Sequence, residues 1–126
     1  MKMLLVAAGG AIGSMARYQI GAWVLARTET WAFPLGTFIV NVLGCLIAGV
    51  LIGVAEYRGF LTLELRVLLF TGFLGGFTTF SAFGVETVAL IERGQFGIAT
   101  GYVAASVVCG IAALFAAIKL AALAAA

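Results

Sequence analysis

The sequence predicts an all-α membrane protein with four transmembrane helices, and two observations support this prediction. First, 64% of its 126 residues are hydrophobic and only 10% are charged, which gives a mean hydropathy of +1.23. A soluble domain has about a quarter of its residues charged, so this much apolar surface requires lipid around it. Second, the apolar residues form four runs, each near the length of about 20 residues that a helix needs to cross a bilayer.

The four runs follow one another with short links. They cover residues 3–26, 35–55, 67–85 and 96–118, and the only charge inside them is Arg17. Because only helices and closed barrels satisfy their backbone polar groups in lipid, each run is predicted to be a helix. The links, residues 27–34, 56–66 and 92–95, are too short to fold separately. We therefore expect residues 1–126 to form one four-span membrane domain, with any function inside the membrane.

Four spans place both chain ends on one side of the membrane. The basic residues outside the spans then divide into Lys2, Arg58, Arg66 and Lys119 on that side and Arg27 and Arg93 on the other. Cytoplasmic loops carry an excess of Lys and Arg, so four against two only weakly favours a cytoplasmic N-terminus. A chain that inserts in both directions would show this weak bias, and so would any small protein with few charges.

Each predicted span also contains a pair of glycines at G-x-x-x-G spacing. The pairs are Gly9 and Gly13, Gly49 and Gly53, Gly72 and Gly76, and Gly97 and Gly101. Small residues at this spacing let helix backbones approach closely, which favours association in lipid. We expect a tightly packed bundle with contacts between subunits, because four short helices enclose little space on their own.

The remaining composition excludes several classes of function. The sequence has no histidine, nucleophile–base pair, metal-ligand cluster or phosphate-binding loop, so we do not expect an enzyme. A net charge of +2 is too small to suggest nucleic-acid binding. Cys45 and Cys109 fall in apolar runs, and we interpret them as small packing residues rather than a disulfide or redox pair.

The third run contains a stretch that an uninterrupted membrane helix would avoid. GFLGGFTTFSAF, residues 72–83, combines glycines with the hydroxyls of Thr78, Thr79 and Ser81. One helix over residues 64–91 would extend roughly 42 Å, which exceeds a hydrocarbon thickness of about 30 Å. We predict that Gly75 and Gly76 loosen the backbone and that hydroxyls satisfy the freed peptide groups, so the helix is broken in mid-membrane. Carbonyls freed at such a break can hold a cation.

Polar and aromatic side chains within the spans are the candidate functional groups. Arg17 either snorkels to the interface or attracts anions, and Asn41 either bonds a neighbouring helix or donates to a passing anion. Phe80 and Phe83, three residues apart, can turn partly positive ring edges towards an anion or merely fill space. Glu86 either lies near the membrane interface or borders a polar path.

The fourth span carries a further polar stripe. Tyr102, Ser106 and Gly110 are spaced four residues apart, so they share one helix face. A stripe of this kind either lines a path with hydroxyls or packs against another helix.

Three ordered motifs resemble those of the Fluc (CrcB) family of fluoride ion channels. GGFTTFSAF, from Gly75 to Phe83, is similar to the family pattern GGxTTFSTF or GGxSTFSTF. GGAIGSMARY, from Gly9 to Tyr18, resembles the first-helix motif with its arginine, and PLGTFIVNVLG, from Pro34 to Gly44, resembles the second-helix motif with its asparagine. The resemblance extends over nearly the whole chain.

This resemblance implies an antiparallel, dual-topology homodimer in a bacterial-type inner membrane. It implies two pores, each lined by side chains from both subunits, that export fluoride passively. The residues that it places along the fluoride path are Asn41, Thr79, Phe80, Ser81, Phe83, Tyr102 and Ser106, with Glu86 nearby. It places Arg17 in a vestibule and assigns the backbone carbonyls of Gly75 and Thr78 to a structural sodium ion at the dimer centre.

The sequence departs from the family pattern at three positions. Ala82 stands where members often have threonine, and Gly84 and Gly110 stand where many have serine. These departures thin the expected line of hydroxyls. One alternative is a small proton-coupled multidrug exporter, but such proteins need a carboxylate in the first helix, where this chain has Arg17 and no acid. A membrane subunit that transports nothing is a further alternative.

Overall fold

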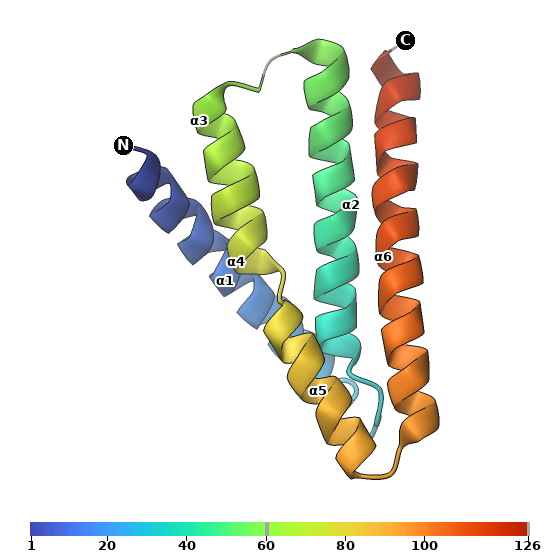
Figure 1. Cartoon of the computed structure of the whole chain (residues 1–126). Helices are drawn as coiled ribbons and strands as arrows, with labels where there is room; N and C mark the ends of the chain where they lie inside the picture. The colour runs from blue at the N-terminus through green and yellow to red at the C-terminus, as the bar shows by residue number, and fades with distance from the viewer. Residues whose placement is uncertain (60, 126) are drawn as a thin grey trace.

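The computed structural model describes residues 1–59 and 61–125 of the chain, and the elements in these ranges are all helical. They are α1 (Lys2–Leu25), α2 (Leu35–Arg58), α3 (Leu63–Arg66), a π-helical segment η1 (Val67–Leu74), α4 (Gly75–Phe77), α5 (Phe80–Glu92) and α6 (Phe96–Ala125). Figure 1 shows α3, η1, α4 and α5 following one another down one side of the molecule. The all-α fold class is therefore confirmed.

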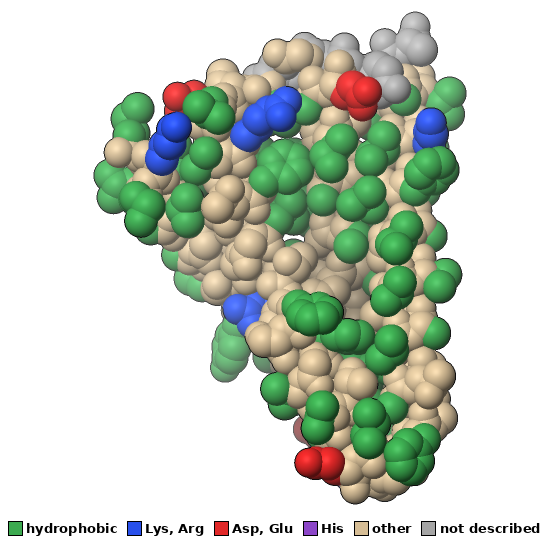
Figure 2. Space-filling model, in the orientation of Figure 1, with side chains coloured by type: hydrophobic (Ala, Val, Ile, Leu, Met, Phe, Trp, Pro, Cys, Tyr) green, Lys and Arg blue, Asp and Glu red, His purple; other side chains and the backbone are tan. Residues whose placement is uncertain are grey.

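The helices form two packed groups. α2 contacts α6 along its length, while α1 crosses and contacts η1 and α4. Figure 1 shows the start of α1, the end of α2, the start of α3 and the end of α6 towards the same end of the molecule. Charged side chains on the face drawn in Figure 2 lie mostly towards its two ends, and hydrophobic side chains cover the flank formed by α6. This distribution is the one expected of helices that cross a membrane.

Three helical stretches within residues 1–59 and 61–125 are long and apolar enough to cross a membrane. They are Leu35–Glu56, Leu63–Glu92 and Phe96–Ala124. α1 is a helix of 24 residues, but Arg17 and other polar side chains lower its hydropathy. The first of the four predicted spans is thus present as a helix, and its position in a membrane stays a prediction.

Three of the four glycine pairs lie at contacts between helices. A Cβ on Gly9 would come within 2.8 Å of the backbone nitrogen of Phe73, and one on Gly76 within 3.0 Å of the Cα of Gly10. A Cβ on Gly49 would lie 2.7 Å from the Cβ of Ala117, so glycine here permits the contact between α2 and α6. Such distances are shorter than almost all contacts that a Cβ makes, so a side chain at these positions would force the helices apart. Glycine thus allows α1 to approach η1 and α4 closely.

The fourth pair behaves differently. Gly97 and Gly101 of α6 are exposed, and no atom of the described residues lies within 4 Å of a Cβ built on either glycine. This pair therefore packs against no other described helix inside one chain, and contacts between subunits through it stay a prediction. The spacing is the same, but this face of α6 points away from the described part of the bundle.

The core lies at the end of the bundle where α5 meets α6. Leu90, Ala99 and Tyr102 are buried there, and Phe33 and Phe38 pack against them. The rings of Phe33 and Tyr102 meet edge to face with centroids 5.3 Å apart, an arrangement favoured by aromatic pairs. This cluster fixes α5 and α6 next to the start of α2.

Candidate functional site

An extended link of two residues separates α4 from α5. Thr78 has φ −86° and ψ 157°, and Thr79 has φ −150° and ψ 116°, which is strand-like backbone between helical neighbours. The Thr79 hydroxyl accepts a hydrogen bond of 3.2 Å from the backbone N–H of Ala82 and so caps the start of α5. Thr78 donates its hydroxyl to the carbonyl of Leu74 at 2.9 Å. The two threonines therefore satisfy backbone groups on both sides of the link.

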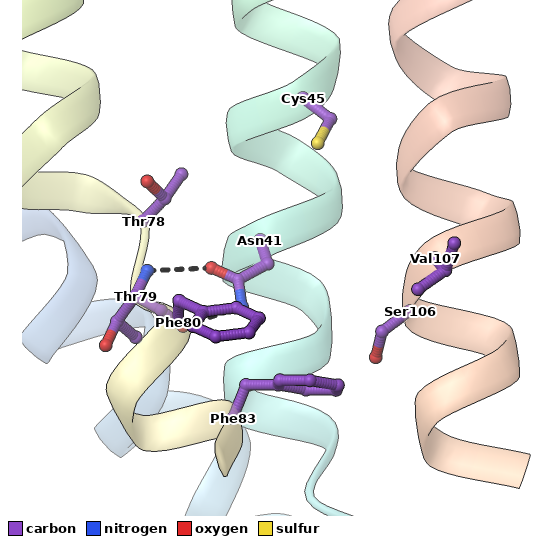
Figure 3. Close-up of a pocket in the computed structure, with 8 residues that line it drawn as sticks. All are labelled: Asn41, Cys45, Thr78, Thr79, Phe80, Phe83, Ser106 and Val107. Carbon is purple, nitrogen blue, oxygen red and sulfur yellow. Dashed lines mark hydrogen bonds between the residues drawn. The ribbon is translucent and has the colours of Figure 1, made fainter. Parts of the chain in front are cut away.

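Asn41 of α2 binds this link through both ends of its side-chain amide. Its Nδ2 donates to the carbonyl of Thr79 at 3.0 Å, and its Oδ1 accepts from the backbone N–H of Thr79 at 2.9 Å. Figure 3 shows the amide turned towards the link. Asn41 thus makes the kind of hydrogen bond to another part of the bundle that the sequence suggested, although its partner is the extended link and not a helix. An amide nitrogen carries two hydrogens, so one N–H of Asn41 is left for another acceptor.

A cavity of about 300 Å³ lies between α2, the link, α5 and α6. Its lining residues, drawn in Figure 3, are Asn41, Cys45, Thr78, Thr79, Phe80, Phe83, Ser106 and Val107. None of these side chains is charged. The hydroxyl oxygen of Ser106 is buried and has no hydrogen-bond partner within residues 1–59 and 61–125. Five of the seven side chains predicted to line a path come together here: those of Asn41, Thr79, Phe80, Phe83 and Ser106.

The two phenylalanines of α5 differ in their surroundings. Their ring centroids are 5.6 Å apart with the planes tilted by 35°. The Phe80 side chain is 84% exposed in the single chain, whereas Phe83 also packs on Tyr102 with centroids 5.1 Å apart. Phe83 thus links the cavity to the buried core, while Phe80 presents its ring to whatever covers this side of the molecule.

Tyr102 and Glu86 lie beyond Phe83 and outside the cavity lining. The Tyr102 hydroxyl donates to Oε2 of Glu86 at 2.6 Å, and the Thr37 hydroxyl donates to Oε1 of the same carboxylate at 2.6 Å. The bonds place Glu86 on the inward face of α5, so it borders the aromatic core instead of lying free at a helix end. Two short hydrogen bonds compensate part of the cost of burying a carboxylate.

Thr37 was missed in the sequence analysis. Its position offered a signal, because it precedes Asn41 by four residues and so shares the same face of α2. The predicted common face of Tyr102, Ser106 and Gly110 is confirmed, since Tyr102 and Gly110 are buried and Ser106 is partly buried. Their face of α6 points towards α2 and α5.

Arg17 reaches the same break from the other side. Its Nε donates to the carbonyl of Gly76 at 3.0 Å, and the Ser14 hydroxyl lies 3.5 Å from that oxygen. Gly76 is in the last turn before the link, where helix carbonyls lose their usual partners. A guanidinium bonded to such a carbonyl stabilises the end of α4, so Arg17 has a local partner in addition to any anion that it attracts.

The remaining predicted residues lie around the link without lining the cavity. Ser81 is exposed, and its hydroxyl lies 3.2 Å from that of Thr79. Gly75 is exposed at the start of α4, and within the described part of the chain only the Phe70 carbonyl lies within 4 Å of a Cβ built on it. An open backbone of this kind leaves room for a partner molecule. Oxygen ligands suit a hard cation such as sodium, so the chemistry of peptide carbonyls at this break fits that ion.

Comparison with known proteins places the chain in a family. The family described as CrcB-like protein, Camphor Resistance (CrcB), matches residues 4–118. This chain belongs to the CrcB family. The resemblance read from the three sequence motifs is therefore confirmed.

Several curated members of this family are similar over almost their whole length. A protein of Methylobacillus flagellatus is 53% identical over 110 residues, which cover 87% of this chain and 86% of the relative. A protein of Rhizobium etli is 51% identical over 116 residues, 92% of each chain, and one of Paracoccus denitrificans is 50% identical over 113 residues, 90% of this chain and 88% of the relative. Each of these relatives is named "Fluoride-specific ion channel FluC".

Proposed function

We propose that this chain is the subunit of a fluoride-selective ion channel that lets fluoride leave the cell passively across a bacterial-type inner membrane. The uncharged cavity at the broken helix carries this proposal together with the names of the relatives. Fluoride is small and strongly hydrated, so a selective path must replace its water with other hydrogen-bond donors. A cavity without a fixed positive charge can bind such an anion and still release it.

The donors available at the cavity are of three kinds. Asn41 has one N–H that the Thr79 carbonyl does not take, and the buried hydroxyl of Ser106 has no partner within the described ranges. The ring edges of Phe80 and Phe83 carry partial positive charge. We infer that fluoride passes these groups and then Phe83 and Tyr102, while the hydroxyls of Tyr102 and Thr37 donate to Glu86 beside the path. Ser81 and the Thr79 hydroxyl serve the break itself, and Arg17 holds Gly76 while adding positive charge nearby.

The exposure of Phe80 supports assembly of two chains. A ring that is 84% exposed in one chain leaves the cavity open on that side. A second copy inserted in the opposite direction would cover it, so the proposed unit is an antiparallel homodimer with two paths. The breaks of two such copies would bring the carbonyls of Gly75 and Thr78 from both chains together around a structural sodium ion. The chain then contributes neutral oxygens to that site.

Anion efflux from liposomes that contain the purified protein tests the proposal. Liposomes loaded with potassium fluoride should release fluoride as soon as valinomycin lets potassium follow, and liposomes loaded with potassium chloride should retain chloride. Exchange of a cationic drug for protons without fluoride release would instead indicate a multidrug exporter. If the liposomes release no fluoride and exchange no drug, the protein is a subunit without transport activity. Drug exchange without fluoride release, or no transport at all, would refute the proposed channel.

A further inference from the structure

Cys45 occupies a special place beside the cavity. It lies four residues after Asn41, one turn along the same face of α2. Figure 3 shows it on α2 at the edge of the cavity, across from Ser106 and Val107 of α6. Its Sγ is 3.3 Å from the position that a Cβ on Gly110 would take. The thiol therefore fills space that a side chain at Gly110 would otherwise need, so Cys45 and Gly110 are matched to each other across the contact between α2 and α6.

The neighbouring hydroxyl gives an independent indication that this part of the cavity receives a ligand. Ser106 lies one turn before Gly110 on the inward face of α6, and its Oγ is buried without a partner within residues 1–59 and 61–125. Nearly all buried hydroxyls in proteins have a hydrogen-bond partner. A molecule or ion that enters the cavity can supply the missing partner of the Ser106 hydroxyl. Cys45 lines that same cavity.

From this geometry we propose that the thiol of Cys45 borders the path of the anion and is a modification site that closes it. The proposal rests on the proposed function, because it takes the cavity as part of the fluoride path. A thiol is a weak donor, so Cys45 lets fluoride pass without holding it. Gly110 lies close to this sulfur on one side and the cavity lies on another, so we expect a group attached to the sulfur to project into the cavity.

The chain supplies its own control for a thiol reagent. Its only other cysteine is Cys109, which is exposed on α6 and does not line the cavity. Methyl methanethiosulfonate is a small reagent for both thiols. The cysteine loses its proton to water, and the thiolate attacks the sulfenyl sulfur of the reagent. A methyl disulfide forms on the cysteine, and methanesulfinate leaves. A group on Cys109 would lie outside the path, so the two sites can be separated by two single substitutions.

The experiment compares fluoride efflux before and after the reagent in the wild type, Cys45→Ala and Cys109→Ala, each relative to its own untreated rate. The wild type and Cys109→Ala should lose most of their efflux and regain it with dithiothreitol, whereas Cys45→Ala should keep its efflux. Mass spectrometry of the same samples reports which cysteine has been modified. Equal inhibition of Cys45→Ala, an unmodified Cys45, or a modified Cys45 with unchanged efflux would each overturn the proposal.

A second variant tests the pairing with Gly110. Gly110→Ser should reduce efflux, because its Cβ would crowd the Cys45 sulfur, and Cys45→Ala combined with Gly110→Ser should recover efflux and resist the reagent. Unchanged efflux in Gly110→Ser would contradict this pairing. No efflux from the untreated wild type would instead refute the proposed function itself, so the two failures are distinguishable.

Discussion

Phe80 and Phe83 belong to one motif but contribute differently to the molecule. Phe83 packs on the buried ring of Tyr102, with centroids 5.1 Å apart. Phe80 is 84% exposed, and Phe83 is the one aromatic ring found against it in the described part of the chain. A substitution at Phe80 can therefore change the proposed path without removing a contact that holds the single chain together.

Phe80→Ile should abolish fluoride efflux while the dimer and its stability persist. Isoleucine keeps an apolar side chain but has no ring edge to offer an anion. Isoleucine also keeps an apolar contact with the second copy that covers this side of the molecule, so the dimer should still form. Efflux from liposomes and size-exclusion chromatography measure the two properties.

A matched control for this variant is Phe96→Ile. Phe96 is 63% exposed at the start of α6 and does not line the cavity, so its variant should conduct like the wild type. Normal efflux from Phe80→Ile would remove the proposed role of the ring edge.

The sequence alone predicted which side chains are candidate functional residues, but it did not predict their partners. Motif and spacing indicated that Asn41, Arg17 and Glu86 were candidate functional residues, because polar side chains in a membrane span are rare and usually have a function. Their partners lie far along the chain: 38 residues separate Asn41 from Thr79, and 59 separate Arg17 from Gly76. Helical periodicity relates residues three or four apart and gives no information about such distant pairs.

At the scale of elements, the link between α4 and α5 is held by α2. Asn41 replaces the hydrogen bonds that the extended backbone of Thr79 would have made in a helix. Peptide groups without partners are costly in lipid, so the break and the asparagine depend on each other. The glycines and threonines of the motif predicted a break, whereas the side chain that supports it came from another helix.

Asn41→Ala should destabilise the protein as well as reduce fluoride efflux. The substitution leaves the N–H and the carbonyl of Thr79 without their partner, which costs about 1–3 kcal/mol for a buried polar group. Unfolding in detergent measures the stability, and liposome efflux measures conduction. Asn41→Asp keeps an acceptor but loses the donor and adds negative charge, so it should reduce fluoride efflux as well. A stable, conducting Asn41→Ala would show that the link does not need α2.

The glycine pairs show how one sequence pattern can have two outcomes. Gly49 lies against Ala117 of α6, while no described residue lies within 4 Å of a Cβ on Gly97. The spacing in the sequence is identical, and only the packed bundle decides which pair is enclosed. A pattern of small residues therefore predicts a capacity for close contact and does not identify the helix that uses it.

Gly49→Ala and Gly97→Ala compare the stability effect of a methyl group at an enclosed glycine with its effect at an exposed one. A methyl group at Gly49 would overlap Ala117 and push α2 from α6, which should lower the unfolding free energy by about 1–3 kcal/mol. Alanine at Gly97 meets open space and favours the helix, so it should not destabilise the chain. Denaturant unfolding of both variants in the same detergent measures the difference, and equal effects would contradict the packing described for α2 and α6.

At the scale of the whole molecule, the sequence predicted an all-helical membrane protein because its composition leaves few other solutions. The family assignment followed from three motifs and is confirmed over residues 4–118. The cavity itself could not be predicted, since it forms where α2, the link, α5 and α6 meet, and these elements are adjacent only after folding. In the proposed dimer, a second copy lies over Phe80 and completes two paths.

The central claim is that this assembly passes fluoride selectively and passively, and its reversal potential in a planar bilayer tests the claim most directly. With sodium fluoride at different concentrations on the two sides and equal sodium chloride added to both, the current through the reconstituted protein should reverse at the Nernst potential of fluoride. A reversal that follows sodium or chloride, or the absence of any current, would contradict the account.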